Sequence, residues 1–181
     1  MGYSQRQRLE VIIAKEFALA ATLLLIALLQ TALPAQPGLF MPNMLLLLTV
    51  CQTLLVGAGS AARWAFYGGL ALDICAGSIL STHALALLAA VMLVSFILAR
   101  LSYSNWLLPL LGVPLGISIY HAVLVGLISL TIKPIDLPTY AIVSLLPDML
   151  VTLIPALPVF LAMRWWREQH PGRVATDVFS L

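Results

Sequence analysis

The sequence predicts an all-α polytopic membrane protein with six transmembrane helices. Hydrophobic residues make up 62% of the chain and charged residues only 9%, whereas a soluble domain carries about 25% charged residues. The formal net charge of +2 excludes the strongly basic surface that nucleic-acid binding requires. The apolar residues fall into six runs, which short polar or proline- and glycine-containing turns separate.

Each of the six runs approaches or exceeds the length needed to cross a bilayer, for which about 20 residues suffice. The predicted spans are 17–33, 42–57, 61–77, 83–99, 106–132 and 139–163. A signal peptide is the alternative for the first run, but its apolar core exceeds the ~7–15 residues of a signal sequence. In the fifth run, Pro109, Gly112, Pro114 and Gly116 predict a bent or broken helix.

The distribution of basic residues predicts the topology. We expect residues 1–16 to form an amphipathic cytoplasmic lead-in, 17–163 the six-helix transmembrane domain, and 164–181 a cytoplasmic tail. Six spans put both termini on one side. If that side is the cytoplasm, eight of the nine Lys and Arg residues are cytoplasmic and only Lys133 lies outside. This asymmetry is what the positive-inside rule requires. The eight are Arg6, Arg8, Lys15, Arg63, Arg100, Arg164, Arg167 and Arg173.

One acid lies in the middle of the third span. Ala65, Gly69, Asp73 and Gly77 recur every four residues, so on a helix they form one stripe of small residues that includes the carboxylate. Small residues allow two helices to approach closely. Because a charged group facing lipid is costly, this stripe is expected to face protein, with Asp73 against a partner.

Three further polar residues lie at membrane depth. His83 opens the fourth span, across a short turn that contains Ser78, so Asp73 and His83 are expected to meet at the outer rim. His121 and Asp148 each lie about 15 Å below the outer turn that joins the last two spans, at 1.5 Å per residue. They are therefore predicted to pair. These are two separate couples rather than the chain of groups that an ion path uses, so a helix-packing role is favoured over transport.

Motifs for catalysis and metal binding are absent from the sequence. It contains no G-x-S-x-G and no H-E-x-x-H. Ser118 lies three residues before His121, but serines in membrane helices usually bond to backbone carbonyls. Cys51 and Cys75 lack metal-ligand spacing and are expected to be small buried hydrophobes. We therefore expect a non-enzymatic protein with no cofactor and no metal.

The stretch 69–85 resembles the bacterial rod-shape-determining protein MreD family. That family shows a glycine-leucine start, an aspartate, a glycine-serine pair, a short turn and a small apolar restart. Ile79 and Ser81 depart from it, because the family often has proline and glycine there. The matching residues are Gly69, Asp73, Gly77, Ser78, His83, Ala84 and Leu85.

The resemblance implies a multi-pass protein of the bacterial cytoplasmic (inner) membrane with both termini cytoplasmic. MreD-like proteins act with the single-span protein MreC and other cell-wall elongation proteins in lateral peptidoglycan synthesis and cell shape. The family is also similar in fold to the substrate-capturing subunits of energy-coupling-factor transporters, which gives the alternative function. Such a subunit needs a polar-lined cavity, and we expect few polar side chains to line one here.

Overall fold

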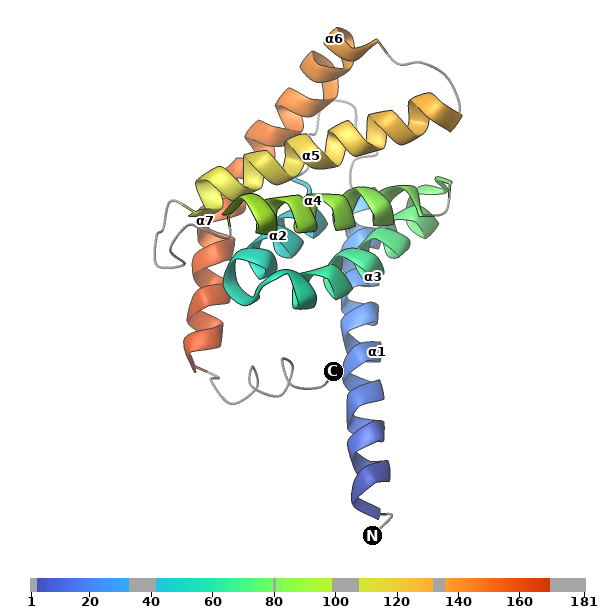
Figure 1. Ribbon diagram of the computed structural model, residues 1–181, viewed down its shortest axis with the longest axis vertical. Coiled ribbons are helices and arrows are strands. Elements are labelled where there is room, and N and C mark those ends of the chain that lie inside the picture. The colour runs from blue at the N-terminus through green and yellow to red at the C-terminus, as the bar shows by residue number, and fades with distance from the viewer. Residues whose placement is uncertain (1–2, 33–41, 80, 99–107, 132–135, 170–181) are drawn as a thin grey trace.

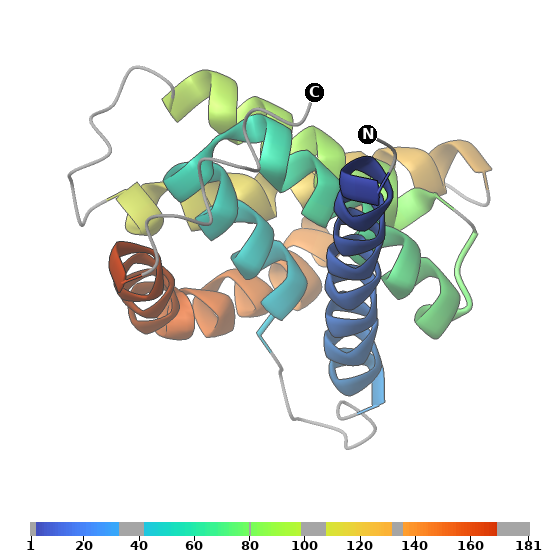
Figure 2. The same cartoon turned by 90° about the horizontal axis from the view of Figure 1, so that it is seen from below.

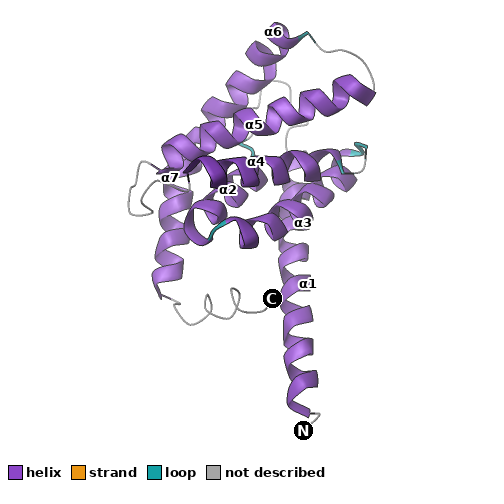
Figure 3. Ribbon diagram, in the orientation of Figure 1, coloured by secondary structure: helices purple, strands orange, loops and turns teal. Residues whose placement is uncertain are grey.

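The computed structural model describes residues 3–32, 42–79, 81–98, 108–131 and 136–169, and for residues 3–9 the backbone alone. In this part of the chain every element is a helix, which confirms the all-α class (Figure 1, Figure 3). The helices are α1 (Tyr3–Ala32), α2 (Met44–Val56), α3 (Ala58–Ala76), α4 (Thr82–Leu98), α5 (Leu108–Thr131), α6 (Leu137–Tyr140), the π-helix η2 (Ala141–Leu145) and α7 (Leu146–Gln169).

Three described helices are long and apolar enough to cross a bilayer: Glu10–Ala32, Leu108–Thr131 and Leu137–Gln169. Met44–Val56 and Thr82–Leu98 are apolar but shorter, at 13 and 17 residues. These features are consistent with a membrane protein. The number of helices of spanning length is smaller than the six predicted spans.

Two sequence-based boundaries differ from the structure. α1 begins at Tyr3, so the expected lead-in and the first apolar run form one continuous helix. α5 runs unbroken from Leu108 to Thr131 with Pro114 inside it, so of the predicted bend or break the break is absent. The glycines near its start provide close packing: a Cβ on Gly116 would lie 2.7 Å from Val50 Cγ2, and one on Gly112 would lie 3.1 Å from Leu54 Cδ1.

The helical segment Leu137–Gln169 contains a π-helical turn near its start. η2 covers Ala141–Leu145, between α6 and α7. Pro147 follows two residues later and lacks the amide that would bond the carbonyl of Val143. A π-turn at this point lets the chain continue as a helix, and such turns often occur at functional sites.

α2 is the centre of the helical assembly. Leu45, Leu46, Leu47, Val50 and Cys51 are all fully buried, and α2 contacts α1, α3, α4, α5 and α7. α1 contributes few core residues and runs nearly vertically in Figure 1, whereas α4 and α5 run across it; Figure 2 shows the same helices from below. Most of the large apolar side chains of α1 are exposed, as expected for a surface that contacts lipid, whereas Leu19 and Ile26 pack partly against the core.

Candidate functional site

The corner between α3 and α4 is built around the Asp73 carboxylate, which is 1% exposed. Its Oδ1 accepts hydrogen bonds from the Ser78 hydroxyl and the His83 amide, each at 2.9 Å, and its Oδ2 lies 3.5 Å from the Ala84 amide. The first amides of a helix have no partner within the helix. Asp73 on α3 therefore caps the N-terminus of α4.

Two glycines allow this corner to form. A Cβ on Gly69 would lie 2.3 Å from Ala84 Cα and 2.6 Å from the Ala84 nitrogen, so α3 and α4 are in backbone contact there. Gly77 ends α3 in the left-handed conformation, at φ 62°, and its amide bonds the Asp73 carbonyl. The stripe prediction for Gly77 is wrong, because Gly77 is exposed and a Cβ there would contact nothing within 4 Å.

His83 bonds Asp73 through its backbone amide rather than through its ring. The ring Nδ1 lies 2.8 Å from the Tyr120 hydroxyl on α5. His83 therefore links the α3–α4 corner to the middle of α5, which packs against α4.

His121 has a hydrogen-bond partner on each ring nitrogen. Nε2 lies 2.8 Å from Asp148 Oδ2, so the predicted pair is present, and Nδ1 lies 2.7 Å from the Tyr140 hydroxyl. A neutral imidazole satisfies both contacts if Nε2–H donates to Asp148 and Tyr140 donates to Nδ1. The Tyr120 ring meets the His121 ring edge to face, with centroids 5.4 Å apart.

The hydrogen bonds continue from Asp148 into α2 and α1. The Thr152 hydroxyl donates to Asp148 Oδ1 at 3.1 Å and accepts from the backbone amide of Asn43 at 2.9 Å. Asn43 Oδ1 caps α2 by accepting from the Leu46 amide, and it also accepts from Gln30 Nε2.

We call this set the polar network. Its hydrogen bonds form two groups, one around Asp73 and one around Asp148, which meet where the Tyr120 ring packs against the His121 ring. Each predicted couple is therefore part of a larger hydrogen-bonded group. The members of the network are Gln30, Asn43, Asp73, Ser78, His83, Tyr120, His121, Tyr140, Asp148 and Thr152. The members come from α1, α3, α4, α5, α6 and α7, from Asn43 just before α2 and from Ser78 after α3. The tyrosines, Asn43 and Thr152 do not stand out in the sequence, because such residues are ordinary in apolar helices. The available signals were Tyr120 beside His121 and Thr152 one turn after Asp148.

Ser118 is not a member of the polar network. The Ser118 hydroxyl donates to the Pro114 carbonyl at 2.8 Å instead of to His121. Among the described residues there is no group of three or more His, Cys, Asp or Glu side chains that could hold a metal ion. Its side chains mainly bond one another and helix ends, which favours a role in holding helices in register.

A groove of about 510 Å³ lies beside the network, between α5 and the α6–η2 segment. Its lining residues are Ser118, His121, Ala122, Val125, Gly126, Ser129, Leu137, Tyr140, Ala141 and Leu145. Four of these ten are polar, so the expectation that few polar side chains line a cavity is only partly met. We call this feature the α5–α6 groove.

No family model, curated protein or solved structure matches this chain. The functional interpretation therefore depends on the residues described above and on the resemblance of the stretch 69–85.

Substitutions at Asp73 test its capping role. Asp73→Asn keeps an oxygen that accepts from Ser78 and His83, so we expect most of the stability to remain. Asp73→Leu leaves these donors unpaired and is expected to cost about 1–3 kcal/mol for each. Thermal unfolding of both purified variants in the same detergent measures the difference. Equal unfolding temperatures would contradict the capping role.

Proposed function

We propose that this chain is a non-enzymatic scaffold subunit of the bacterial cell-shape (elongation) complex, supporting lateral peptidoglycan synthesis together with an MreC-like single-span protein. The observation that carries the proposal is the α3–α4 corner. The residues that resemble the MreD family here act as a helix cap and a backbone contact, through Asp73 and Gly69. Residues with these structural roles hold α3 against α4. They thereby shape a surface that other helices can contact, and they perform no chemistry themselves.

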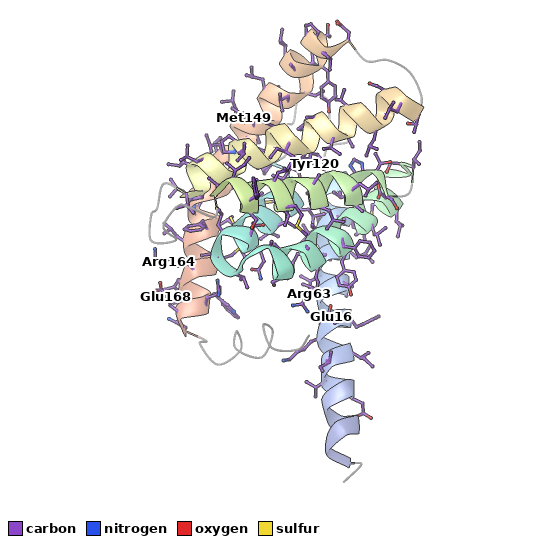
Figure 4. All side chains as sticks on the ribbon, viewed as in Figure 1. Glu16, Arg63, Tyr120, Met149, Arg164 and Glu168 are labelled. Carbon is purple, nitrogen blue, oxygen red and sulfur yellow. The ribbon has the colours of Figure 1, made fainter. Side chains whose placement is uncertain are left out.

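We further propose six spans in the cytoplasmic membrane, with both termini in the cytoplasm. Contacts at one end of the assembly support this arrangement. Glu16 of α1 pairs with Arg63 near the start of α3 at 2.9 Å, and Arg167 of α7 donates to the Leu55 carbonyl at the end of α2. In Figure 4 the labelled charged residues Glu16, Arg63, Arg164 and Glu168 all lie in the lower half, below Tyr120 and Met149.

At the other end of the assembly, contacts join the C-terminal ends of α1 and α3 to the N-terminal ends of α2 and α4. Gln30 near the end of α1 bonds Asn43 before α2, and Asp73 near the end of α3 bonds His83 at the start of α4. Both contacts join the end of one helix to the residues that open the next. The basic end is expected to face the cytoplasm.

Reporter fusions test this topology. We expect an alkaline phosphatase fused after Leu181 to be inactive and one inserted at Lys133 to be active, because that enzyme folds only outside the cytoplasm. A fluorescent protein that folds only in the cytoplasm should give the opposite pattern. An active phosphatase at the C-terminus would exclude the six-span topology.

The α5–α6 groove favours a second candidate, a substrate-capturing subunit of an energy-coupling-factor type transporter. Sites for small ligands typically have volumes of about 300–1,000 Å³ with a few polar groups, and the groove lies within this range. A capture subunit is stabilised by its substrate, by about 2.7 kcal/mol at a concentration one hundred times Kd. The scaffold needs no water-soluble ligand.

Depletion in the native cell, combined with ligand screening, distinguishes the two candidates. The scaffold proposal predicts rounded cells with misplaced wall growth. It also predicts that no vitamin-like compound raises the unfolding temperature of the purified protein. Normal cell shape after deletion, together with a clear ligand-dependent shift, would establish the transporter function instead.

A further inference from the structure

The α5–α6 groove has an open floor made by small residues. Ser118, Ala122, Gly126 and Ser129 follow one another along α5 and line it. A Cβ on Gly126 would meet nothing within 4 Å, so the space above it is empty of protein. From Ser118 to Ser129 the groove extends about 16 Å along the helix, at 1.5 Å per residue.

Both walls belong to helices that can span a membrane, α5 and the continuous segment Leu137–Gln169. Large apolar side chains around the groove are exposed: Leu130 is 85%, Ile142 69% and Leu137 65% exposed. In a bilayer such a surface contacts hydrocarbon, so the groove opens toward lipid. An acyl chain is the apolar molecule present there at high concentration, and its shape suits a long narrow space.

Two hydroxyl groups in the lining remain able to bind a polar end group. The Ser129 hydroxyl has no hydrogen-bond partner among the described residues, and it lies two residues before the end of α5. Tyr140 hydrogen-bonds His121 Nδ1, and its oxygen keeps a lone pair for another donor. The Ser129 hydroxyl can both donate and accept, as a glycerol hydroxyl requires. The Tyr140 oxygen can only accept, and it lies beside His121, about 12 Å along α5 from Ser129.

We propose that the α5–α6 groove binds one acyl chain of a glycerolipid, with the glycerol hydroxyl end near Ser129 and the chain running along Gly126 and Ala122 toward Ser118 and the Tyr140 hydroxyl. This site depends only on α5 and Leu137–Gln169 lying in a membrane and is independent of the scaffold role. Binding of lipid here would tie η2 and α6 to α5 beside the His121–Asp148 pair.

The test uses the full chain in phosphatidylcholine nanodiscs and a monoacylglycerol that carries a photoreactive diazirine in its acyl chain. After illumination, we expect labelled residues to concentrate in 118–129 and 137–145. Unlabelled monooleoylglycerol should compete with this labelling, because the site is saturable. Equal labelling of α1 and α5, without competition, would show an ordinary lipid annulus and overturn the proposal.

Gly126→Leu fills the groove and Gly59→Leu is its matched control, because a Cβ at either glycine meets nothing within 4 Å. Gly126→Leu should lower groove labelling by roughly an order of magnitude, which corresponds to about 1.4 kcal/mol of binding energy. Gly59→Leu should leave it unchanged.

If Gly126→Leu abolishes co-purification of a partner protein but leaves lipid labelling intact, the groove holds a partner helix and the lipid proposal is wrong. If Gly126→Leu folds poorly, the competition experiment on the unaltered chain decides.

Discussion

Gly69→Leu is expected to abolish the folded protein. An added Cβ alone would lie 2.3 Å from Ala84 Cα and 2.6 Å from the Ala84 nitrogen, and both are backbone atoms that cannot rotate away. The leucine side chain would have to separate α3 from α4. That separation also pulls the His83 amide away from Asp73, so a packing defect and unpaired buried donors arise together.

The comparison uses three variants expressed and purified side by side. Gly69→Leu should give little monodisperse protein by size-exclusion chromatography, and Gly69→Ala should give protein with a clearly lower unfolding temperature. Gly59→Leu, on the same helix but with open space around it, should behave as the unaltered chain. Normal yield and stability of Gly69→Leu would show that the α3–α4 corner is not in backbone contact.

His121→Leu is expected to have the second largest effect. The substitution leaves the Asp148 oxygen and the Tyr140 hydroxyl without their partner. Both groups are partly buried, so the cost for each is expected toward the lower end of about 1–3 kcal/mol. The triple variant His121→Leu, Asp148→Leu, Tyr140→Phe removes both orphaned groups, although the Thr152 hydroxyl loses its acceptor, and it should recover part of the loss.

Thermal unfolding of the single and triple variants measures this coupling. Ser118→Ala serves as the control, since its hydroxyl bonds only the Pro114 carbonyl on its own helix. If the triple variant is less stable than His121→Leu by the summed effects of Asp148→Leu and Tyr140→Phe, the proposed coupling is contradicted.

Features that depend on local spacing were predictable from the sequence. The positions of α2, α3 and α4 follow from apolar runs between turn residues, and their observed bounds differ from the predicted ones by a few residues. The pairing of His121 with Asp148 follows from equal depth on antiparallel helices. The position of the Asp73 carboxylate among small residues predicts that it has a partner. It does not predict that this partner is the N-terminus of the next helix.

Features that depend on how helices rotate and cross were not predictable. Whether Tyr120 faces His83 or lipid depends on the rotation of α5, which apolar composition does not define because the helix is hydrophobic on all sides. The connection from Asp148 through Thr152 to Asn43 joins residues 109 positions apart. Pro114 predicts a break, but packing of Gly112 and Gly116 against α2 keeps α5 continuous.

Affinity purification of the tagged chain from its native membrane in mild detergent tests the central claim most directly. The scaffold proposal predicts that an MreC-like single-span protein co-purifies with the chain, and that no transporter ATPase does. Co-purification of an ATPase module without any single-span elongation protein would contradict the proposal.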